Sequence, residues 1–138
     1  MRIELGTWDE LRARAAPIRF TVFVEEQKVP LEIEIDAEDP RSLHALALDA
    51  SGAAVATGRL LPDGHIGRMA VLQCARGRGV GTAVLLSLME AARARGQREV
   101  VLSAQTHAVS FYARIGFATE GEVYDDAGIP HIDMRRTL

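Results

Sequence analysis

The stretch Arg76-Gly77-Arg78-Gly79-Val80-Gly81-Thr82 decides the fold, because it lies between an apolar segment ending at Leu72 and a run of helical periodicity. Glycines lack a Cβ and let the backbone approach an anion closely, and the first amides of a helix carry the positive end of its dipole. The helical run has apolar residues at Val80, Val84, Leu85, Leu88 and Ala92 and stops at Gly96. The stretch therefore predicts a strand, a tight turn and a helix whose start can bind phosphate.

Two well-known phosphate-binding loops fit this glycine turn less well. A nucleotide-triphosphate P-loop needs Lys where this chain has Thr82, and a dinucleotide-binding turn needs its third glycine at that same position. A purely structural strand-to-helix turn is the remaining alternative. The flanking arginines 76 and 78 form a local cationic spot, which favours a small anionic ligand.

Outward from the turn, strand and helix patterns alternate. Strands are expected over residues 2–5, 43–48, 54–61, 66–72, 99–104, 117–124 and 129–134, and a short helix over 108–115. Thr7 and Glu10 form a capping-box pattern that begins an N-terminal helix, which Pro17 is expected to divide or kink. The acidic segment 25–39 favours a surface loop or a short helical turn. We predict an α/β (α+β) fold with a mixed, mostly antiparallel sheet of about six to seven strands flanked by helices.

Composition limits the classes of protein that fit this chain. Its 138 residues, 48% of them hydrophobic, are enough for one core, so we expect a single domain over residues 1–138. No apolar run suits a membrane span or a signal peptide, which predicts a soluble, cytoplasmic protein without a membrane partner. A net charge of −3 gives nucleic acid no broad basic surface. The lone Cys74 and four scattered histidines predict no metal site, and a homodimer is left open.

Four segments resemble one family. Arg76-x-x-Gly79-x-Gly81 resembles the pyrophosphate-binding signature of GNAT acyltransferases, and Ala108-x-x-x-Tyr112-x-x-x-Gly116-Phe117 is similar to a second signature of that family, in the same order. Residues 20–27 and 124–134 resemble the ElaA/YjcF-like branch of bacterial GNAT proteins. The resemblance covers nearly the entire chain and implies a GNAT-like fold.

The resemblance implies direct transfer of an acetyl group from acetyl-CoA, as cosubstrate and without a metal, to the amine of a small molecule or protein. Tyr112 is the implied catalytic residue, which would protonate the departing thiolate, and an amide near Val71 would face the thioester oxygen. The implied cofactor-binding residues are Met69, Ala70, Val71, Arg76, Gly77, Arg78, Gly79, Val80, Gly81, Thr82 and Gln105. Gln105 stands where many family members have Asn, and its amide can bond to a pantetheine arm or to a neighbouring loop.

The general base and the acceptor are not identified by the sequence. Candidates for the base are His131, the carboxylates Glu25, Glu26, Glu34 and Asp36, and a water chain. The candidate substrate residues are Phe23, Glu25, Glu26, Arg68 and His131. The acidic segment favours a cationic amine if it borders the acceptor pocket, whereas Arg59 and Arg68 can either pair with those carboxylates or bind an acidic acceptor. A non-catalytic CoA-binding sensor and a plain interaction domain are alternatives, and the presence of Tyr112 argues against the sensor.

Overall fold

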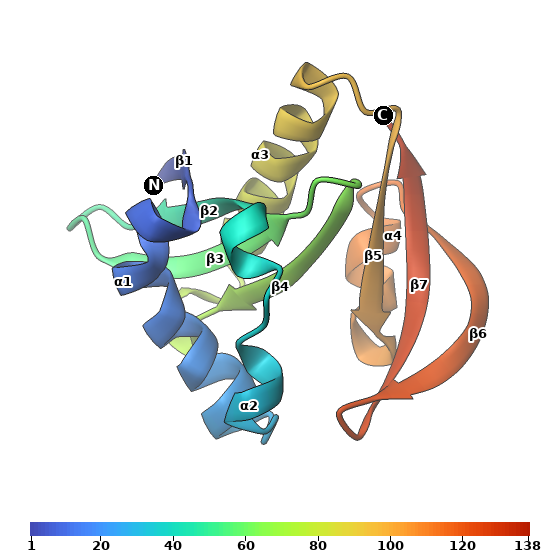
Figure 1. The fold of residues 1–138 in the computed structure, drawn as a ribbon, viewed down its shortest axis with the longest axis horizontal. Coiled ribbons are helices and arrows are strands. Elements are labelled where there is room, and N and C mark those ends of the chain that lie inside the picture. Colours follow the sequence, from blue (N-terminus) through green and yellow to red (C-terminus); the bar gives the residue numbers. More distant parts are fainter.

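Seven strands form one sheet in the computed structural model, which describes all 138 residues. The sheet order is β1-β2-β3-β4-β5-β7-β6, and all neighbours are antiparallel except β4 and β5. The strands are β1 (Arg2–Gly6), β2 (Leu43–Leu48), β3 (Ala54–Leu60), β4 (His65–Val71), β5 (Glu99–Gln105), β6 (Ala118–Asp126) and β7 (Ile129–Thr137). The helices are α1 (Trp8–Arg19), α2 (Leu31–Glu34), α3 (Val80–Ala94) and α4 (Val109–Ala113), as Figure 1 shows. The predicted fold class is confirmed.

The N-terminal helix begins as predicted but is not divided by Pro17. In the capping box, the Thr7 N–H donates to the Glu10 carboxylate at 2.8 Å, and the Glu10 N–H donates to the Thr7 hydroxyl. The α-helical pattern runs through Pro17 to Arg19 and continues as a π-helix, η1 (Phe20–Glu26). Proline removes one hydrogen bond from the helix, but the buried apolar face of α1 holds it against the sheet.

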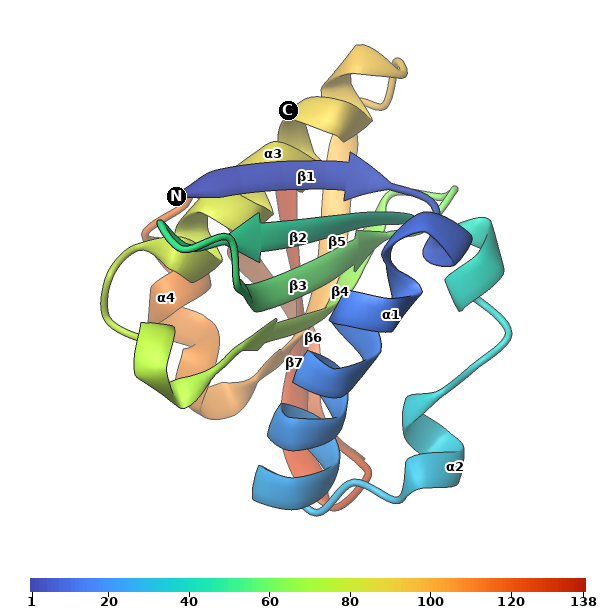
Figure 2. The same cartoon turned by 90° about the vertical axis from the view of Figure 1, so that its left-hand side faces the viewer.

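Two hydrophobic clusters lie on opposite faces of the sheet, because successive side chains of a strand point to opposite sides. Ala45 and Ala47 of β2 pack in the cluster that contains α3, whereas Leu46 and Leu48 pack in the cluster that contains α1. Figure 2 shows α1 in front of the sheet and α3 behind it. The sheet is thus covered by a helix on each face along its first half.

The sheet splits between β4 and β5. These parallel strands pair only at His65 with Val101 and at Ile66 with Leu102, after which they diverge (Figure 1). The edge of β4 from Gly67 to Val71 therefore has no strand partner on the side of β5. Backbone groups of β4 on this edge therefore lack a strand partner, and among them the Val71 carbonyl oxygen accepts from Arg76 Nε.

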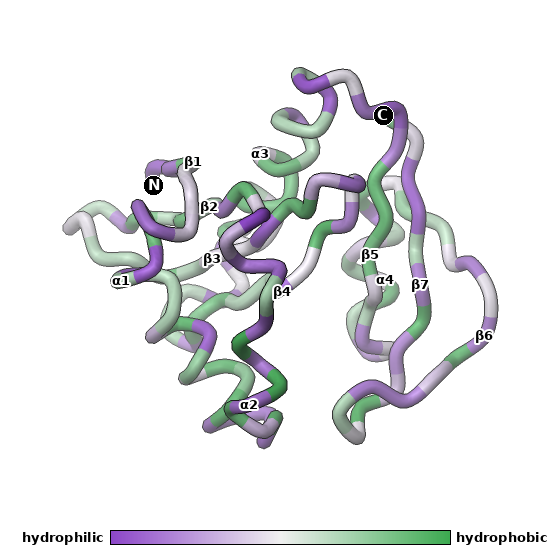
Figure 3. The backbone as a smooth tube through the Cα atoms, in the orientation of Figure 1, coloured by the Kyte–Doolittle hydropathy of each residue, from purple (hydrophilic) through white to green (hydrophobic).

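The outer strand β6 differs from the rest of the sheet, since every one of its residues is exposed. In Figure 3 the inner strand β5 is largely green, whereas β6 mixes purple, white and green segments. None of the helices has both the length and the hydropathy that a membrane-spanning helix needs.

Candidate active site

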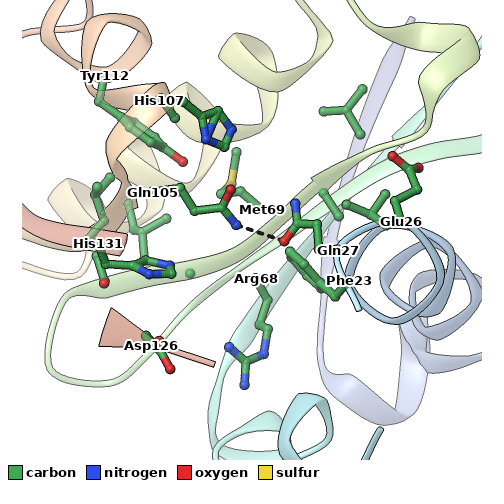
Figure 4. A pocket seen from close by; sticks show the side chains of 18 of the residues that line it. Phe23, Glu26, Gln27, Arg68, Met69, Gln105, His107, Tyr112, Asp126 and His131 are labelled. Atoms are coloured by element: carbon green, nitrogen blue, oxygen red, sulfur yellow. Dashed lines mark hydrogen bonds between the residues drawn. The ribbon is translucent and has the colours of Figure 1, made fainter. Parts of the chain in front are cut away.

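A cleft of about 520 Å³ lies where β4 and β5 diverge. Its walls come from η1, from β4, from the end of β5 with the turn after it, from α4 and from the β6–β7 hairpin (Figure 4). Of the predicted site residues, it is lined by Phe23, Glu26, Arg68, Met69, Ala70, Val71, Arg76, Gln105, Tyr112 and His131. The divergence of the strands thus brings together residues separated by more than half of the chain.

The glycine turn lines a neighbouring cavity of about 330 Å³ that shares Met69, Val71, Arg76 and Tyr112 with the cleft. The two cavities therefore adjoin at these four residues, and together they are called the groove. Gly77, Gly79, Val80, Gly81 and Thr82 all line its outer part, whereas Arg78 lines neither cavity.

Two glycines of the turn adopt backbone angles that other residues avoid. Gly77 and Gly79 both have φ of +77°, and Gly79 is the N-cap of α3. Gly81 has an ordinary φ, but a Cβ there would lie 3.4 Å from Val71 Cγ2 and 3.7 Å from Phe111 Cζ. A larger side chain at Gly81 would therefore enter the cavity, which makes the turn suitable for close approach of a phosphate group.

Arg76 connects the glycine turn to η1. Its Nε donates to the Val71 carbonyl oxygen at 2.9 Å, and its Nη2 donates to the Glu26 carboxylate at 2.8 and 3.0 Å. The Glu26 carboxylate is therefore held in an ion pair, and Glu26 lines the cleft but not the cavity at the glycine turn. Glu25, its neighbour in the sequence, is exposed and lines neither cavity.

Tyr112 presents its hydroxyl group to the cleft. Its ring packs edge-on against Phe111 and Phe117, with centroid distances of 5.0 and 6.0 Å. Burial raises the pKa of Tyr112 to about 12. In Figure 4 the hydroxyl points into the cavity, and no protein group hydrogen-bonds to it. The phenol is thus protonated at neutral pH and available as a proton donor.

Gln105 joins the two walls of the cleft. Its Nε2 donates to Gln27 Oε1 at 2.8 Å, the bond drawn as a dashed line in Figure 4. Of the two partners that the sequence allowed for the Gln105 amide, the structure shows the neighbouring segment. The sequence did not predict that the partner residue is Gln27. Gln27 follows the last residue of η1, and no periodicity or motif distinguishes it from other polar residues of that segment.

His131 lies opposite Gln105 in the register of β5 and β7. The residue is buried, and its Nδ1 lies 2.7 Å from the Ile129 carbonyl oxygen. Because a carbonyl oxygen only accepts, Nδ1 carries the proton and Nε2 of the neutral ring keeps its lone pair. The ring stacks on Tyr124 at a centroid distance of 6.1 Å. His131 can therefore accept a proton at Nε2 inside the cleft.

The acidic segment is held by a buried network of ion pairs. Asp39 binds both Arg19 and Arg59, at 2.7 and 2.9 Å, and Glu34 also binds Arg19. Asp36 binds Arg59 at 2.7 Å. Burial alone would raise the pKa of Asp39, but the two arginines outweigh it and the pKa is lowered. The expected solvent-exposed location is wrong for Glu34 and Asp39, because the segment folds back over arginines of α1 and β3.

Arg68 belongs to the same network. It lies in a β-bulge, where β4 places Arg68 and Met69 opposite the single residue Gly58, and its φ is +48°. Its guanidinium donates to the Ile33 and Glu34 carbonyl oxygens and to Asp36 at 3.0 Å. Of the two roles left open for Arg59 and Arg68, the structure shows the pairing with carboxylates.

The comparisons with known proteins agree with this geometry. The model of the acetyltransferase (GNAT) domain family matches residues 13–138, and the chain belongs to this family of acyl-CoA-dependent N-acetyltransferases. It is 38% identical over 139 residues to YjcF of Bacillus subtilis, named as an uncharacterised N-acetyltransferase, with 99% of each chain covered.

Two solved structures place the chain within the family. Escherichia coli ElaA is 31% identical, with a TM-score of 0.88 and 99% of both chains covered. An acyl-CoA N-acyltransferase from Pseudomonas aeruginosa is 34% identical, with a TM-score of 0.87 and 98% of both chains covered. The chain is thus an ElaA/YjcF-like GNAT protein, as the sequence motifs predicted.

Proposed function

We propose that the protein transfers an acetyl group from acetyl-CoA to an amine by direct attack, as one domain over residues 1–138. The observation that carries this proposal is the groove of two adjoining cavities, one of which is lined by the glycine turn and both of which are lined by Tyr112. The turn supplies amides for a pyrophosphate, and the phenol supplies a proton. A groove with both features suits a substrate that has a phosphate group at one end and a reactive thioester at the other.

The unpaired edge of β4 would hold the middle of the cosubstrate. Met69, Ala70 and Val71 line the cleft beside this edge, and a pantetheine arm carries amide groups that can pair with an extended backbone. An amide near Val71 would stabilise the negative charge that develops on the thioester oxygen. One donor of this kind contributes a factor of about 10² to 10³ in turnover.

Tyr112 and His131 divide the proton transfers between them in this proposal. The amine nitrogen forms a bond to the acetyl carbon, the carbon–sulfur bond breaks, and Tyr112 donates its proton to the departing thiolate. His131 Nε2 accepts the proton that the amine loses, directly or through water. The position of the Tyr112 hydroxyl in the cleft and the hydrogen bond of His131 Nδ1 to the Ile129 carbonyl oxygen, which leaves Nε2 to accept, support these roles.

A panel of amines incubated with acetyl-CoA tests the proposal. Thiol release that depends on the amine, with the acetylated amine identified by mass spectrometry, is the expected result. A shift of the melting temperature by CoA without any thiol release would instead favour the non-catalytic sensor. Acetylation of the protein itself in the absence of an amine would contradict direct transfer.

A further inference from the structure

A smaller cavity of about 120 Å³ adjoins the cleft at the Gln27–Gln105 bridge. Both glutamines line both cavities, whereas Tyr112 lines only the larger one. The apolar part of the wall of this smaller cavity comes from η1, α2, the segment between them and the β6–β7 hairpin: Phe23, Val29, Ile33, Ala127 and Ile129. This cavity therefore begins where the proposed chemistry takes place and extends away from the cofactor.

The charges of this smaller cavity are paired with one exception. Arg68 is bound by Asp36, and Glu34 is bound by Arg19, so neither offers an uncompensated charge. Asp126 lines both cavities and makes no side-chain hydrogen bond or ion pair. Figure 4 shows Asp126 on the far side of Gln105 and His131 from Tyr112. Starting from Tyr112, an occupant would therefore pass Gln105 and His131 before it reaches the carboxylate of Asp126 (Figure 4).

We propose that the smaller cavity binds the acceptor, and that the acceptor is a flexible diamine or polyamine. The inference rests on the proposed function. The reacting amine would lie at the bridge, where the side-chain oxygen of Gln105, which makes no hydrogen bond within the protein, and His131 Nε2 can both accept from it. The carbon chain would contact the apolar wall, and the second ammonium group would pair with Asp126.

An acceptor with a carboxylate at its far end fits this cavity poorly. Such a group needs an unpaired cation, and Arg68 is the only lysine or arginine that lines the cavity. Its guanidinium is already bound by Asp36 and two carbonyl oxygens. A carboxylate would also be repelled by Asp126, so the structure discriminates against it both by a missing attraction and by repulsion.

Three acceptors of equal chain length test this inference: cadaverine, n-pentylamine and δ-aminovalerate, which end in an ammonium, a methyl and a carboxylate group. For the wild type at low salt, kcat/KM is expected to be highest for cadaverine, by about fivefold over pentylamine, and lowest for aminovalerate. Asp126→Asn should reduce the preference for cadaverine to about twofold or less. Glu122→Gln removes the same charge from the same strand outside the cavities and should keep the full preference.

The remaining outcomes separate this inference from the proposed function. Equal rates with cadaverine and pentylamine, or a cadaverine preference unchanged by Asp126→Asn, would overturn the role of Asp126. If none of the three amines reacts while another class of amine is acetylated, the acceptor class is wrong and the proposed function stands. Absence of acetyl-CoA binding to the wild type would overturn both.

Discussion

The proposed cofactor end and the proposed acceptor end of the site are built from different parts of the chain. At the proposed cofactor end, one contiguous turn, residues 76–82, lines the cavity with every residue except Arg78. At the acceptor end, side chains from η1, α2, β5 and the β6–β7 hairpin meet around the Gln27–Gln105 bridge. A backbone site depends on conformation and tolerates changes of side chain, whereas a side-chain site depends on how several elements are held together.

The two walls of the acceptor end also differ from each other. The wall formed by residues 31–39 is fixed by buried ion pairs to α1 and β3. The opposite wall is the exposed β6–β7 hairpin, in which every residue of β6 is accessible. We therefore expect substitutions in the first wall to affect stability and those in the hairpin to affect acceptor choice.

The largest effect is expected for Asp39→Ala, which removes the shared partner of Arg19 and Arg59. Breaking a buried ion pair on one side costs about 3–5 kcal/mol, because a charge is left buried without compensation. Urea unfolding should show this loss in the free energy of unfolding. Glu38→Ala, which removes a surface ion pair to Arg41, is the control and should cost about 1 kcal/mol or less. Equal losses would mean that the network does not anchor the wall.

Tyr112 lies between the two ends of the site. Tyr112→Phe should reduce turnover by at least about tenfold, which is within the range of general acid catalysis. The ring and its packing are kept, so the affinity for acetyl-CoA and the melting temperature should barely change. The loss should shrink with a thioester of a more acidic thiol, because a better leaving group needs less protonation. Full turnover under conditions where transfer limits the rate would make Tyr112 a packing residue.

Phe23→Ala should raise the KM of the acceptor by about fivefold or more, because an apolar side chain that lines both acceptor-side cavities is lost. The dissociation constant of acetyl-CoA should stay within about twofold. The matched control is Phe20→Ala, an exposed phenylalanine on the same π-helix that lines neither cavity. If Phe23→Ala changes only the affinity for acetyl-CoA, the acceptor and the cofactor are not bound by separate parts of the site.

The smallest effect is expected for Glu26→Gln, at the cofactor end. The Glu26 carboxylate pairs with Arg76 beside the glycine turn, so its removal frees a positive charge for an anionic ligand. Affinity for acetyl-CoA should rise by about two- to threefold at low salt and approach that of the wild type at high salt. Calorimetric titrations at two salt concentrations measure this. Weaker binding of acetyl-CoA to Glu26→Gln would contradict this expectation, and would show that the ion pair to Glu26 holds Arg76 and the glycine turn in the binding conformation.

The contrast between the ends also explains what could be predicted from the sequence. Gly77 and Gly79 have positive φ in one contiguous turn, so a short stretch of sequence was enough to predict this turn. The order of the strands along the chain followed from periodicity. The burial of Glu34 and Asp39 depends on arginines 15 to 20 positions away in the chain, at Arg19 and Arg59. The Gln27–Gln105 bridge joins residues 78 positions apart, and no local pattern encodes such a contact.

Titration of acetyl-CoA into the wild type and into Gly81→Val tests the central claim most directly. Gly81 has an ordinary φ, so valine there fills the cavity beside Val71 and Phe111 without the strain that a positive φ would add. Calorimetry should give low-millimolar or tighter binding to the wild type and no measurable binding to Gly81→Val, while circular dichroism shows the same fold for both. Equal affinity in the two proteins would contradict the placement of the cofactor on the glycine turn.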